Sequence, residues 1–237
     1  MQLNLTPRPV VRQGLIYLRD QMGVLPKVVI DPSAGAGVFG AVAREVWPKA
    51  HLIGVERDAD MAALAERNYD AFHHGDFEAY AAGASFNDDA LVTSNPPPEG
   101  FARLRAERLE SWIPIALKLA PVAWLYGKEN VGIRVQAQER LFSMLPPVLE
   151  ARVSGAIRHR GRGVGSDSHA YAWWLWCAAG QTTNVLTGWL PEALKEMPDR
   201  TWPTLNLPRL TARERTWIGT MPGQEERGVK AIGPAGT

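Results

Sequence analysis

The chain has 237 residues, of which 46% are hydrophobic, which is ample for one α/β domain with a sizeable core. Its net charge of +1 indicates no particular partner, and its single cysteine, Cys177, excludes an intrachain disulfide framework. The Cys and His residues form no cluster with metal-ligand spacing, so we expect no metal site. The polar start at residues 1–4 is unlike a signal peptide, and the longest apolar stretch, 170–180, is too short to span a bilayer. We therefore expect a cytoplasmic protein with no membrane partner.

The first predicted strand, glycine turn and helix occupy residues 27–40. A β-branched run breaks at Asp31 into small residues and then into an apolar helical pattern. Gly35 and Gly37 would let the backbone turn sharply and approach a ligand, to which the helix N-terminus offers free N–H groups. Gly35, Gly37 and Gly40 also match the Gly-x-Gly-x-x-Gly dinucleotide pattern, which is a weak signal alone.

Two acidic residues follow at the ends of the next predicted strands. The strand at 51–55 ends at Glu56, about where a nucleotide-binding fold places a carboxylate on ribose hydroxyls. The alternative is a surface glutamate that favours the N-terminus of the next helix. Asp76, in the segment 74–77, could accept a hydrogen bond from an adenine amine, or could simply be a turn residue.

The segment most informative about chemistry is the strand at 91–94 with Asn95, Pro96, Pro97 and Pro98 after it. The Asn95 side-chain carbonyl and the next backbone carbonyl can together accept both hydrogens of a planar amino group. The prolines restrict φ, so that both oxygens would point the same way. The alternative is an ordinary proline turn after an edge strand.

The elements after this loop continue an alternating pattern. We predict a helix from about 102 to 119, a central strand at 122–126 and a second helix at about 131–145. Residues 148–178 read as two antiparallel strands around a polar, glycine-rich loop.

That loop concentrates positive charge. Residues 152–162 contain no acid and carry Arg152, Arg158, His159, Arg160 and Arg162. Such a segment can contact phosphates, although a solvated loop whose arginines pair with nearby carboxylates is the alternative. Trp173 and its neighbours in the following strand are expected mostly in the core, and base stacking by Trp173 is the less favoured interpretation.

In this order the motifs resemble those of the S-adenosylmethionine-dependent methyltransferases, over roughly residues 6–180. The specific likeness is to amino-methyltransferases whose signature is Asn/Asp-Pro-Pro followed by an aromatic residue. Thr6-Pro7-Arg8-Pro9 resembles their N-terminal cofactor-side motif, although it is also an ordinary helix start, with Thr as N-cap. The motif order is similar to that of adenine-N6 DNA methyltransferases of the gamma arrangement, and residues 167–173 resemble a strand of short phage-type enzymes.

This resemblance implies a Rossmann-like class I α/β fold. The expected sheet is doubly wound, mostly parallel and seven-stranded, with an antiparallel terminal hairpin. The catalytic domain would cover residues 1–180, followed by an irregular arm at 181–220 that packs on it and a disordered tail at 221–237. We expect a monomer or a homodimer.

The resemblance also assigns roles to individual residues. The cofactor, S-adenosyl-L-methionine, would be held by Thr6, Pro7, Asp31, Ser33, Gly35, Gly37, Glu56, Arg57, Asp76, Phe77 and Asn95. Among these, Asp31 and the glycines would face the methionine part, Glu56 the ribose and Asp76 the adenine. The catalytic segment would be Asn95, Pro96, Pro97 and Pro98. Nucleic acid would be contacted by Arg158, His159, Arg160, Arg162 and Phe101.

One position departs from the family pattern. The residue after the second proline is usually aromatic and stacks on the extruded base, which is worth about 1–3 kcal/mol, but in this chain it is Pro98. Phe101, Tyr126 or Trp173 could substitute for it.

The resulting expectation is a methyltransferase of phage or restriction–modification type that acts on the N6 amine of adenine in DNA, with base flipping and little or short sequence specificity. Two alternatives stay open: methylation of RNA or of a protein glutamine amide, and a noncatalytic module that binds cofactor or nucleic acid. A nicotinamide enzyme is disfavoured, because residues 31–34 separate the first strand from the first glycine.

Overall fold

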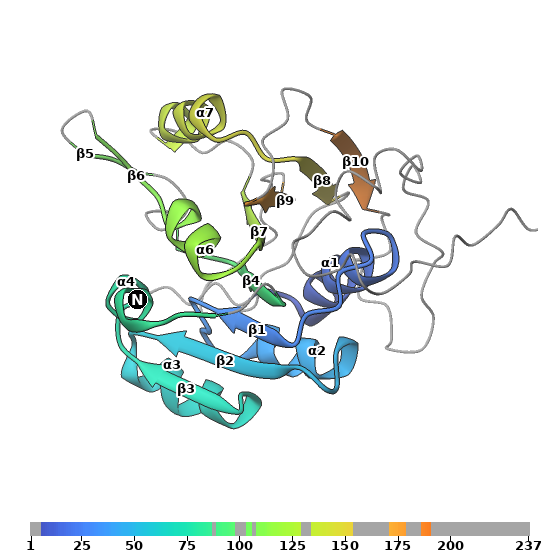
Figure 1. Ribbon diagram of the computed structural model, residues 1–237, viewed down its shortest axis with the longest axis vertical. Coiled ribbons are helices and arrows are strands. Elements are labelled where there is room, and N and C mark those ends of the chain that lie inside the picture. The colour runs from blue at the N-terminus through green and yellow to red at the C-terminus, as the bar shows by residue number, and fades with distance from the viewer. Residues whose placement is uncertain are drawn as a thin grey trace, which may run out of the picture.

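The computed structural model describes residues 6–86, 89–97, 103–105, 108–128, 134–153, 171–178 and 186–190. A single sheet of eight strands, in the order β10-β8-β9-β7-β4-β1-β2-β3, organises these residues (Figure 1). The strands are β1 (Val28–Asp31), β2 (His51–Glu56), β3 (Ala71–His74), β4 (Ala90–Ser94), β7 (Val122–Lys128), β8 (Leu149–Val153), β9 (Tyr171–Cys177) and β10 (Leu186–Leu190).

Strand direction divides the sheet into two parts. From β3 through β2, β1 and β4 to β7, every neighbouring pair is parallel. β9 then runs antiparallel to both β7 and β8, while β10 is parallel to β8. All residues of β4 are buried, as expected for a strand covered by helices on both faces.

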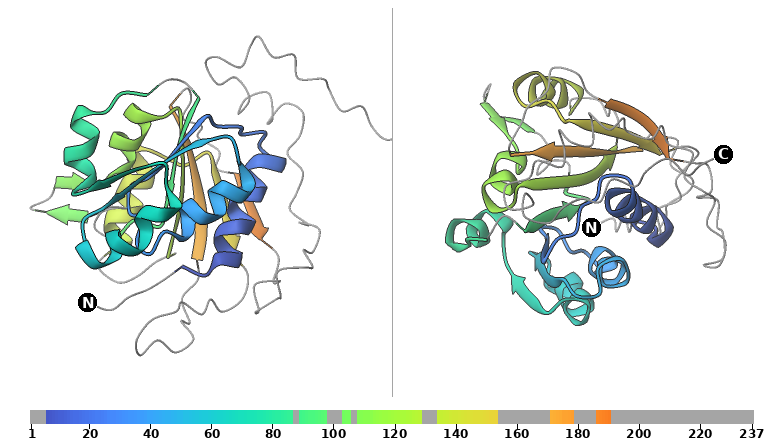
Figure 2. Two further views of the ribbon diagram at one scale, coloured as in Figure 1. Left: turned by 90° about the horizontal axis from the view of Figure 1, so that it is seen from below. Right: turned by 45° about the vertical axis from the view of Figure 1, so that its right-hand side comes forward.

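Helices cover both faces of the sheet. On one face, α1 (Arg8–Asp20) and α2 (Val38–Val46) pack in one apolar core, with α3 (Ala59–Ala65) and the short helix η1 (Glu66–Asn68) beside α2. On the other face, α4 (Phe77–Gly83), α6 (Ile113–Leu119) and α7 (Arg134–Met144) contribute to a second core. Figure 2 shows these two sets of helices on opposite sides of the strands.

The expected fold class is confirmed. The seven expected strands, with their antiparallel terminal pair, are β1–β4 and β7–β9. β10 is an additional strand, and it lies within the range 181–220 that we had expected to be irregular. The helix at 134–144 and the antiparallel strands β8 and β9 also agree with expectation.

The helix predicted from about 102 to 119 is wrong in its first half. Residues in this range form a two-stranded antiparallel hairpin, β5 (Arg103–Arg105) and β6 (Arg108–Glu110), before α6 begins at Ile113. The sequence Arg-Leu-Arg in β5 and Arg-Leu-Glu in β6 alternates polar and apolar residues, which is the period of a strand rather than of a helix.

The C-terminal residues 191–237, which include the expected tail, lie outside the described part of the chain. Within the described ranges, no helix combines the length and the apolar character needed to cross a membrane.

Candidate active site

The candidate site lies along one edge of the parallel strands. Because β1 to β4 run in the same direction, their carboxyl ends meet at a common edge, which is called the carboxyl edge below. Asp31 ends β1, Glu56 ends β2, and Asn95 directly follows β4. The chain first winds outward from β1 through β2 to β3 and then returns to β4 on the other side of β1. Ligands of open α/β sheets bind at such a reversal point, so the sheet order locates the site beside these residues.

Glycine is needed at the two positions of the turn after β1 for different structural reasons. Gly35 and Gly37 have φ values of 53° and 85°, a region that L residues other than glycine rarely adopt. A Cβ on Gly37 would lie 2.4 Å from Asn68 Nδ2 and 3.0 Å from Ala65 Cα, so this glycine permits close packing of α2 on α3 and η1. A Cβ on Gly35 would meet no atom within 4 Å, so the space beside Gly35 is open to a ligand.

Glu56 is tied to the glycine turn rather than lying free on the surface. Its Oε2 accepts a hydrogen bond from the Gly35 N–H at 2.7 Å, and its Oε1 accepts one from the Asp58 N–H at 2.9 Å. Capping of α3 is carried out by Asp58, whose carboxylate accepts from the N–H groups of Asp60 and Met61. The half-buried Glu56 carboxylate thus stands beside the open space at Gly35, as a ribose ligand would require.

The Asp31 carboxylate is the centre of a buried hydrogen-bond network. Its Oδ2 accepts from the Tyr69 hydroxyl at 2.6 Å, and its Oδ1 accepts from the Ser94 hydroxyl at 2.7 Å and the Ser33 N–H at 3.2 Å. The Tyr69 oxygen in turn accepts from the Gly40 N–H at 3.2 Å. These bonds connect the ends of β1 and β4 with α2 and with the residue after η1.

Burial raises the pKa of Asp31 to about 6. The hydrogen bonds from Tyr69, Ser94 and Ser33 act in the opposite direction, and the nearby negative charge of Glu56 raises the pKa further. Asp31 was predicted from the sequence as a site residue, whereas its two hydroxyl donors, Tyr69 and Ser94, were not. Ser94 stands next to Asn95, whereas Tyr69 is 38 residues from Asp31, and no local pattern in the sequence marks that pairing.

Asn95 is held by the N-terminal segment of the chain. Its Nδ2 donates to the Thr6 hydroxyl oxygen at 2.9 Å, across 89 residues of sequence. Thr6 is 7% exposed and does not cap α1, whose N-cap position is occupied by Pro7 without a side-chain hydrogen bond. The bond engages the nitrogen end of the amide, so the carbonyl end, Oδ1, is turned away from Thr6. Pro96 is buried and Pro97 half-buried directly after it.

The remaining described cofactor candidates lie at the ends of β2 and β3. The Asp76 side chain is 60% exposed at the start of α4, with its Oδ1 3.6 Å from Nη1 of Arg57, which is 74% exposed. Phe77 is 2% exposed, and its ring centroid lies 5.2 Å from that of Trp112 in an edge-on contact. Asp76 and Arg57 are therefore at the carboxyl edge, whereas the Phe77 ring is part of the core. Their roles toward a cofactor stay predictions.

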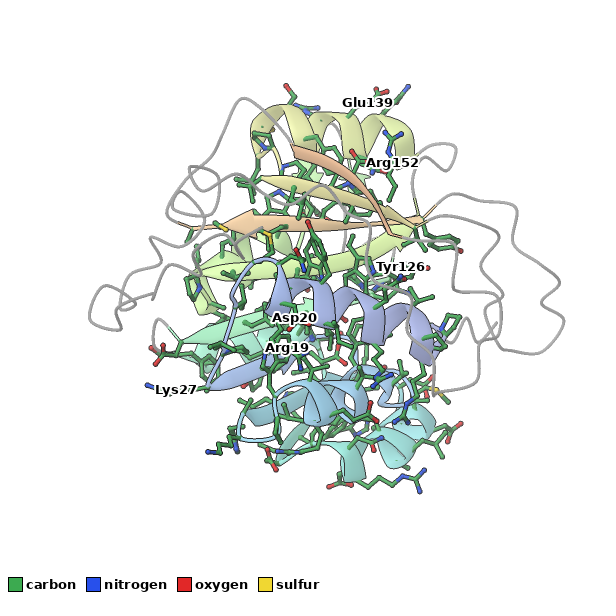
Figure 3. All side chains as sticks on the ribbon, turned by 90° about the vertical axis from the view of Figure 1, so that its right-hand side faces the viewer. Arg19, Asp20, Lys27, Tyr126, Glu139 and Arg152 are labelled. Carbon is green, nitrogen blue, oxygen red and sulfur yellow. The ribbon has the colours of Figure 1, made fainter. Side chains whose placement is uncertain are left out.

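Two of the three aromatic candidates for replacing the residue at Pro98 are core side chains. Tyr126 and Trp173 are both 0% exposed. Trp173 stacks on Trp124 at 5.3 Å between centroids, and Tyr126 stacks on Tyr171 at the same distance. Figure 3 shows Tyr126 within the body of the molecule beside α1. Neither ring has a face available to an extruded base.

Several predicted site residues lie outside the described part of the chain, namely Pro98, Phe101, Arg158, His159, Arg160 and Arg162. Arg152, which begins the basic segment, is described: its Nε donates to Glu150 Oε1 at 2.9 Å within β8. The strands on either side of the basic segment are also described. Val153 of β8 pairs with Tyr171 of β9, and Tyr171 pairs with Lys128 at the end of β7, so β8 ends and β9 begins at the carboxyl edge.

No group of three or more His, Cys, Asp or Glu side chains that could hold a metal ion occurs among the described residues. The fold is that of the Rossmann-like methyltransferases, and comparisons with known proteins agree. No protein-family profile matches the sequence. The chain is 38% identical over 66 residues to the type II methyltransferase M.XamI of Xanthomonas campestris pv. amaranthicola. That match covers 28% of this chain and 12% of the length of that relative.

Solved structures with the same fold include methyltransferases of two kinds. The modification subunit of a proposed type I restriction enzyme from Vibrio vulnificus has a TM-score of 0.55 and 17% identity, over 79% of this chain and 47% of that one. A type I restriction–modification methyltransferase subunit from Streptococcus thermophilus has a TM-score of 0.54 and 13% identity, over 92% and 52%. A proposed RNA methyltransferase from Pyrococcus horikoshii has a TM-score of 0.52 and 20% identity, over 73% and 85%. The chain thus resembles S-adenosylmethionine-dependent methyltransferases, DNA methyltransferases among them, and it spans about half the length of the two restriction–modification subunits.

Proposed function

We propose that the protein is an S-adenosylmethionine-dependent methyltransferase that modifies the exocyclic N6 amine of adenine in DNA. The observation that carries this proposal is the placement of Asn95. Its amide lies directly after β4 at the carboxyl edge and donates a hydrogen bond to Thr6. The preceding residue, Ser94, donates a hydrogen bond to Asp31, which ends β1 just before the glycine turn. An amine-accepting group and a nucleotide-binding turn are thereby fixed side by side.

The residues present fit the cofactor. Open space beside Gly35, the half-buried Glu56 carboxylate at that N–H, and the exposed Asp76 at the end of β3 lie in the order that an amino acid, a ribose and an adenine would require. The Asp31 carboxylate would attract the ammonium of the methionine part, directly or through the turn that it stabilises. When bound, S-adenosylmethionine supplies a methyl group already activated by its sulfonium.

The chain's task is then to position the acceptor in line with that methyl group. An aromatic amine is a poor nucleophile, because its lone pair is delocalised into the ring. Hydrogen bonds from the amine to Asn95 Oδ1 and to the Pro96 carbonyl would favour a pyramidal nitrogen and would stabilise the positive charge that develops on it. An adenine in a duplex would have to be flipped out of the stack to reach this site.

DNA is the substrate that the surroundings favour. The strands that flank the basic segment 152–162 end at Val153 and begin at Tyr171, both at the carboxyl edge, which also carries Asn95, and a basic segment can contact phosphates. Methyltransferase subunits of restriction–modification systems are among the proteins with a similar fold. The Pyrococcus horikoshii structure favours RNA as a second candidate substrate.

The proposal is tested by transfer of labelled methyl groups from S-adenosylmethionine to unmethylated genomic DNA, with total RNA and protein in parallel reactions. Label on adenine N6 in DNA supports the proposal. Label in RNA alone, or on protein glutamine alone, would show that RNA or protein is the substrate instead of DNA. Cofactor binding without any methyl transfer would indicate a noncatalytic binding module.

Two variants of Asn95 examine the mechanism. Asn95→Ala should lower turnover by at least about 100-fold, because it removes an acceptor that acts on the transition state, which is the typical effect of losing one such hydrogen bond. Asn95→Asp is the matched control, since it keeps an acceptor oxygen and should retain more activity than the alanine variant. Cofactor affinity, measured by calorimetry, should change little in either. An alanine variant as active as the wild type would contradict the mechanism.

A further inference from the structure

The hairpin formed by β5 and β6 has no role in the function proposed so far. It lies between Asn95 and α6 in the sequence. This position determines at which edge of the sheet the hairpin lies. β4 and β7 are parallel neighbours, so α6, which connects them, must begin at the carboxyl edge and return to the opposite edge. The hairpin precedes α6 and therefore belongs to the carboxyl edge. Figure 1 shows it projecting from the body of the molecule near α6.

A second contact is consistent with this position. The hairpin strands touch α7, which begins at Arg134 soon after β7 has ended at Lys128, again at the carboxyl edge. Arg103, the first hairpin residue, follows Asn95 by eight residues, which limits their separation to about 28 Å even for an extended chain.

The strand register gathers charge on one face of the hairpin. Arg103 pairs with Glu110, Leu104 with Leu109, and Arg105 with Arg108. Residues opposite one another in an antiparallel pair share a face, and successive pairs alternate between faces. The two leucines therefore occupy positions on one face, and three arginines and a single glutamate occupy positions on the other.

The pairing of Arg105 with Arg108 is unfavourable for an isolated hairpin, because like charges directly opposite one another destabilise a strand pair. An anion bound between the two positions would remove that repulsion. Phosphates of nucleic acid present such anions at regular spacing, about 3.4 Å per nucleotide along each strand. Within about 28 Å, the hairpin reaches only phosphates within roughly eight nucleotides of the base presented to Asn95.

We propose that the β5–β6 hairpin is an arm that contacts the DNA backbone through phosphates near the target adenine. This inference rests on the proposed function, which it deepens by naming a contact surface separate from the basic segment 152–162. Contacts of this kind position the duplex and carry no sequence information themselves.

The test measures binding of the full chain to a fluorescent 30-base-pair DNA duplex by anisotropy, at several salt concentrations. Loss of two phosphate contacts lowers the magnitude of the slope of log affinity against log salt by about 1.8. We expect this change for Arg105→Ala/Arg108→Ala. Arg105→Lys/Arg108→Lys keeps the charge and should keep the wild-type slope.

The matched control removes two exposed cations from the opposite edge of the sheet. Lys49 precedes β2 and the exposed Lys118 lies in the last turn of α6, so Lys49→Ala/Lys118→Ala changes the net charge equally at a distance from the site. Its slope should equal that of the wild type, and thermal unfolding should show that all variants are folded.

A wild-type slope in the Arg105→Ala/Arg108→Ala variant overturns the inference, as does a control that loses as much slope as this variant. Because binding and methyl transfer are measured separately, the two proposals can fail independently. If the protein methylates DNA but Arg105→Ala/Arg108→Ala has the wild-type slope, only the proposed hairpin contact is contradicted. If the slope falls in Arg105→Ala/Arg108→Ala but no methyl group is transferred to any substrate, only the proposed catalytic function is contradicted.

Discussion

At the Asp31 carboxyl group, burial and hydrogen bonding act on the pKa in opposite directions, and burial dominates, with the pKa raised to about 6. In the folded protein this group would keep its proton well above the pH at which an unfolded aspartate loses it, near 3.8. Between these values the native state binds more protons than the unfolded state, so the contribution of Asp31 to the free energy of unfolding decreases as pH rises. It is fully present below about pH 4 and lost as pH rises through about 6.

This pH dependence can be isolated with Asp31→Asn, which is neutral throughout. The wild type should lose up to about 3 kcal/mol of unfolding free energy, relative to this variant, between pH 4 and pH 7, because two pKa units correspond to about that amount. Urea denaturation at four pH values measures it. The control is Asp60→Asn, which removes a carboxyl group from the exposed surface instead of the buried one. Parallel curves for the wild type and Asp31→Asn would show that the native carboxyl has an ordinary pKa.

Among the elements, the glycine turn before α2 combines two tasks that substitution can separate. Gly37 is packed against η1 and α3, whereas Gly35 faces open space, although both have positive φ. Alanine at either position carries the left-handed penalty of roughly 1–2 kcal/mol. At Gly37 the overlap with Asn68 and with the backbone of Ala65 is added to this penalty.

We therefore expect Gly37→Ala to lower the free energy of unfolding by clearly more than Gly35→Ala, by about 2 kcal/mol or more against about 1. For cofactor affinity the order should reverse among folded variants, because a methyl group on Gly35 occupies the space that a ligand would use. Urea denaturation and calorimetric titration with S-adenosylmethionine compare the two. Equal losses of stability and affinity in both variants would contradict this division of tasks.

The elements also show where sequence patterns are sufficient. The strands that end at Asp31, Glu56 and Ser94 were predicted because short buried runs followed by turn residues are local features. The bonds from Tyr69 to Asp31 and from Asn95 to Thr6 were not, since they join residues 38 and 89 positions apart. β5 and β6 were missed because three-residue strands next to a true helix are easily absorbed into its pattern, and the burial of Tyr126 and Trp173 depends on the packing of α1 over the sheet.

At the scale of the whole molecule, the residues proposed to bind the cofactor come from segments that lie far apart in the sequence. Thr6 precedes α1, Asp31 and Gly35 follow β1, Glu56 ends β2 and Asn95 follows β4. A ligand that contacts several of these segments binds only the folded state and so raises its stability by mass action. The effect is a property of the complete site rather than of any one residue.

This linkage distinguishes the two cofactor classes that the glycine pattern allows. S-adenosylmethionine at about 100 times its dissociation constant should add about 2.7 kcal/mol to the free energy of unfolding, which is a rise in Tm of roughly 5–10 °C for a chain of this size. NAD and NADH at the same concentration should leave Tm unchanged, because Asp31 and the residues after it lie where a dinucleotide fold places its first glycine directly after the strand. Differential scanning fluorimetry measures the Tm with each of the three ligands. The Asn95→Ala variant keeps the glycine turn intact, so its Tm should still rise with S-adenosylmethionine. Stabilisation by a nicotinamide cofactor but not by S-adenosylmethionine would overturn the assignment of the site and make the Asn-Pro-Pro segment a structural turn.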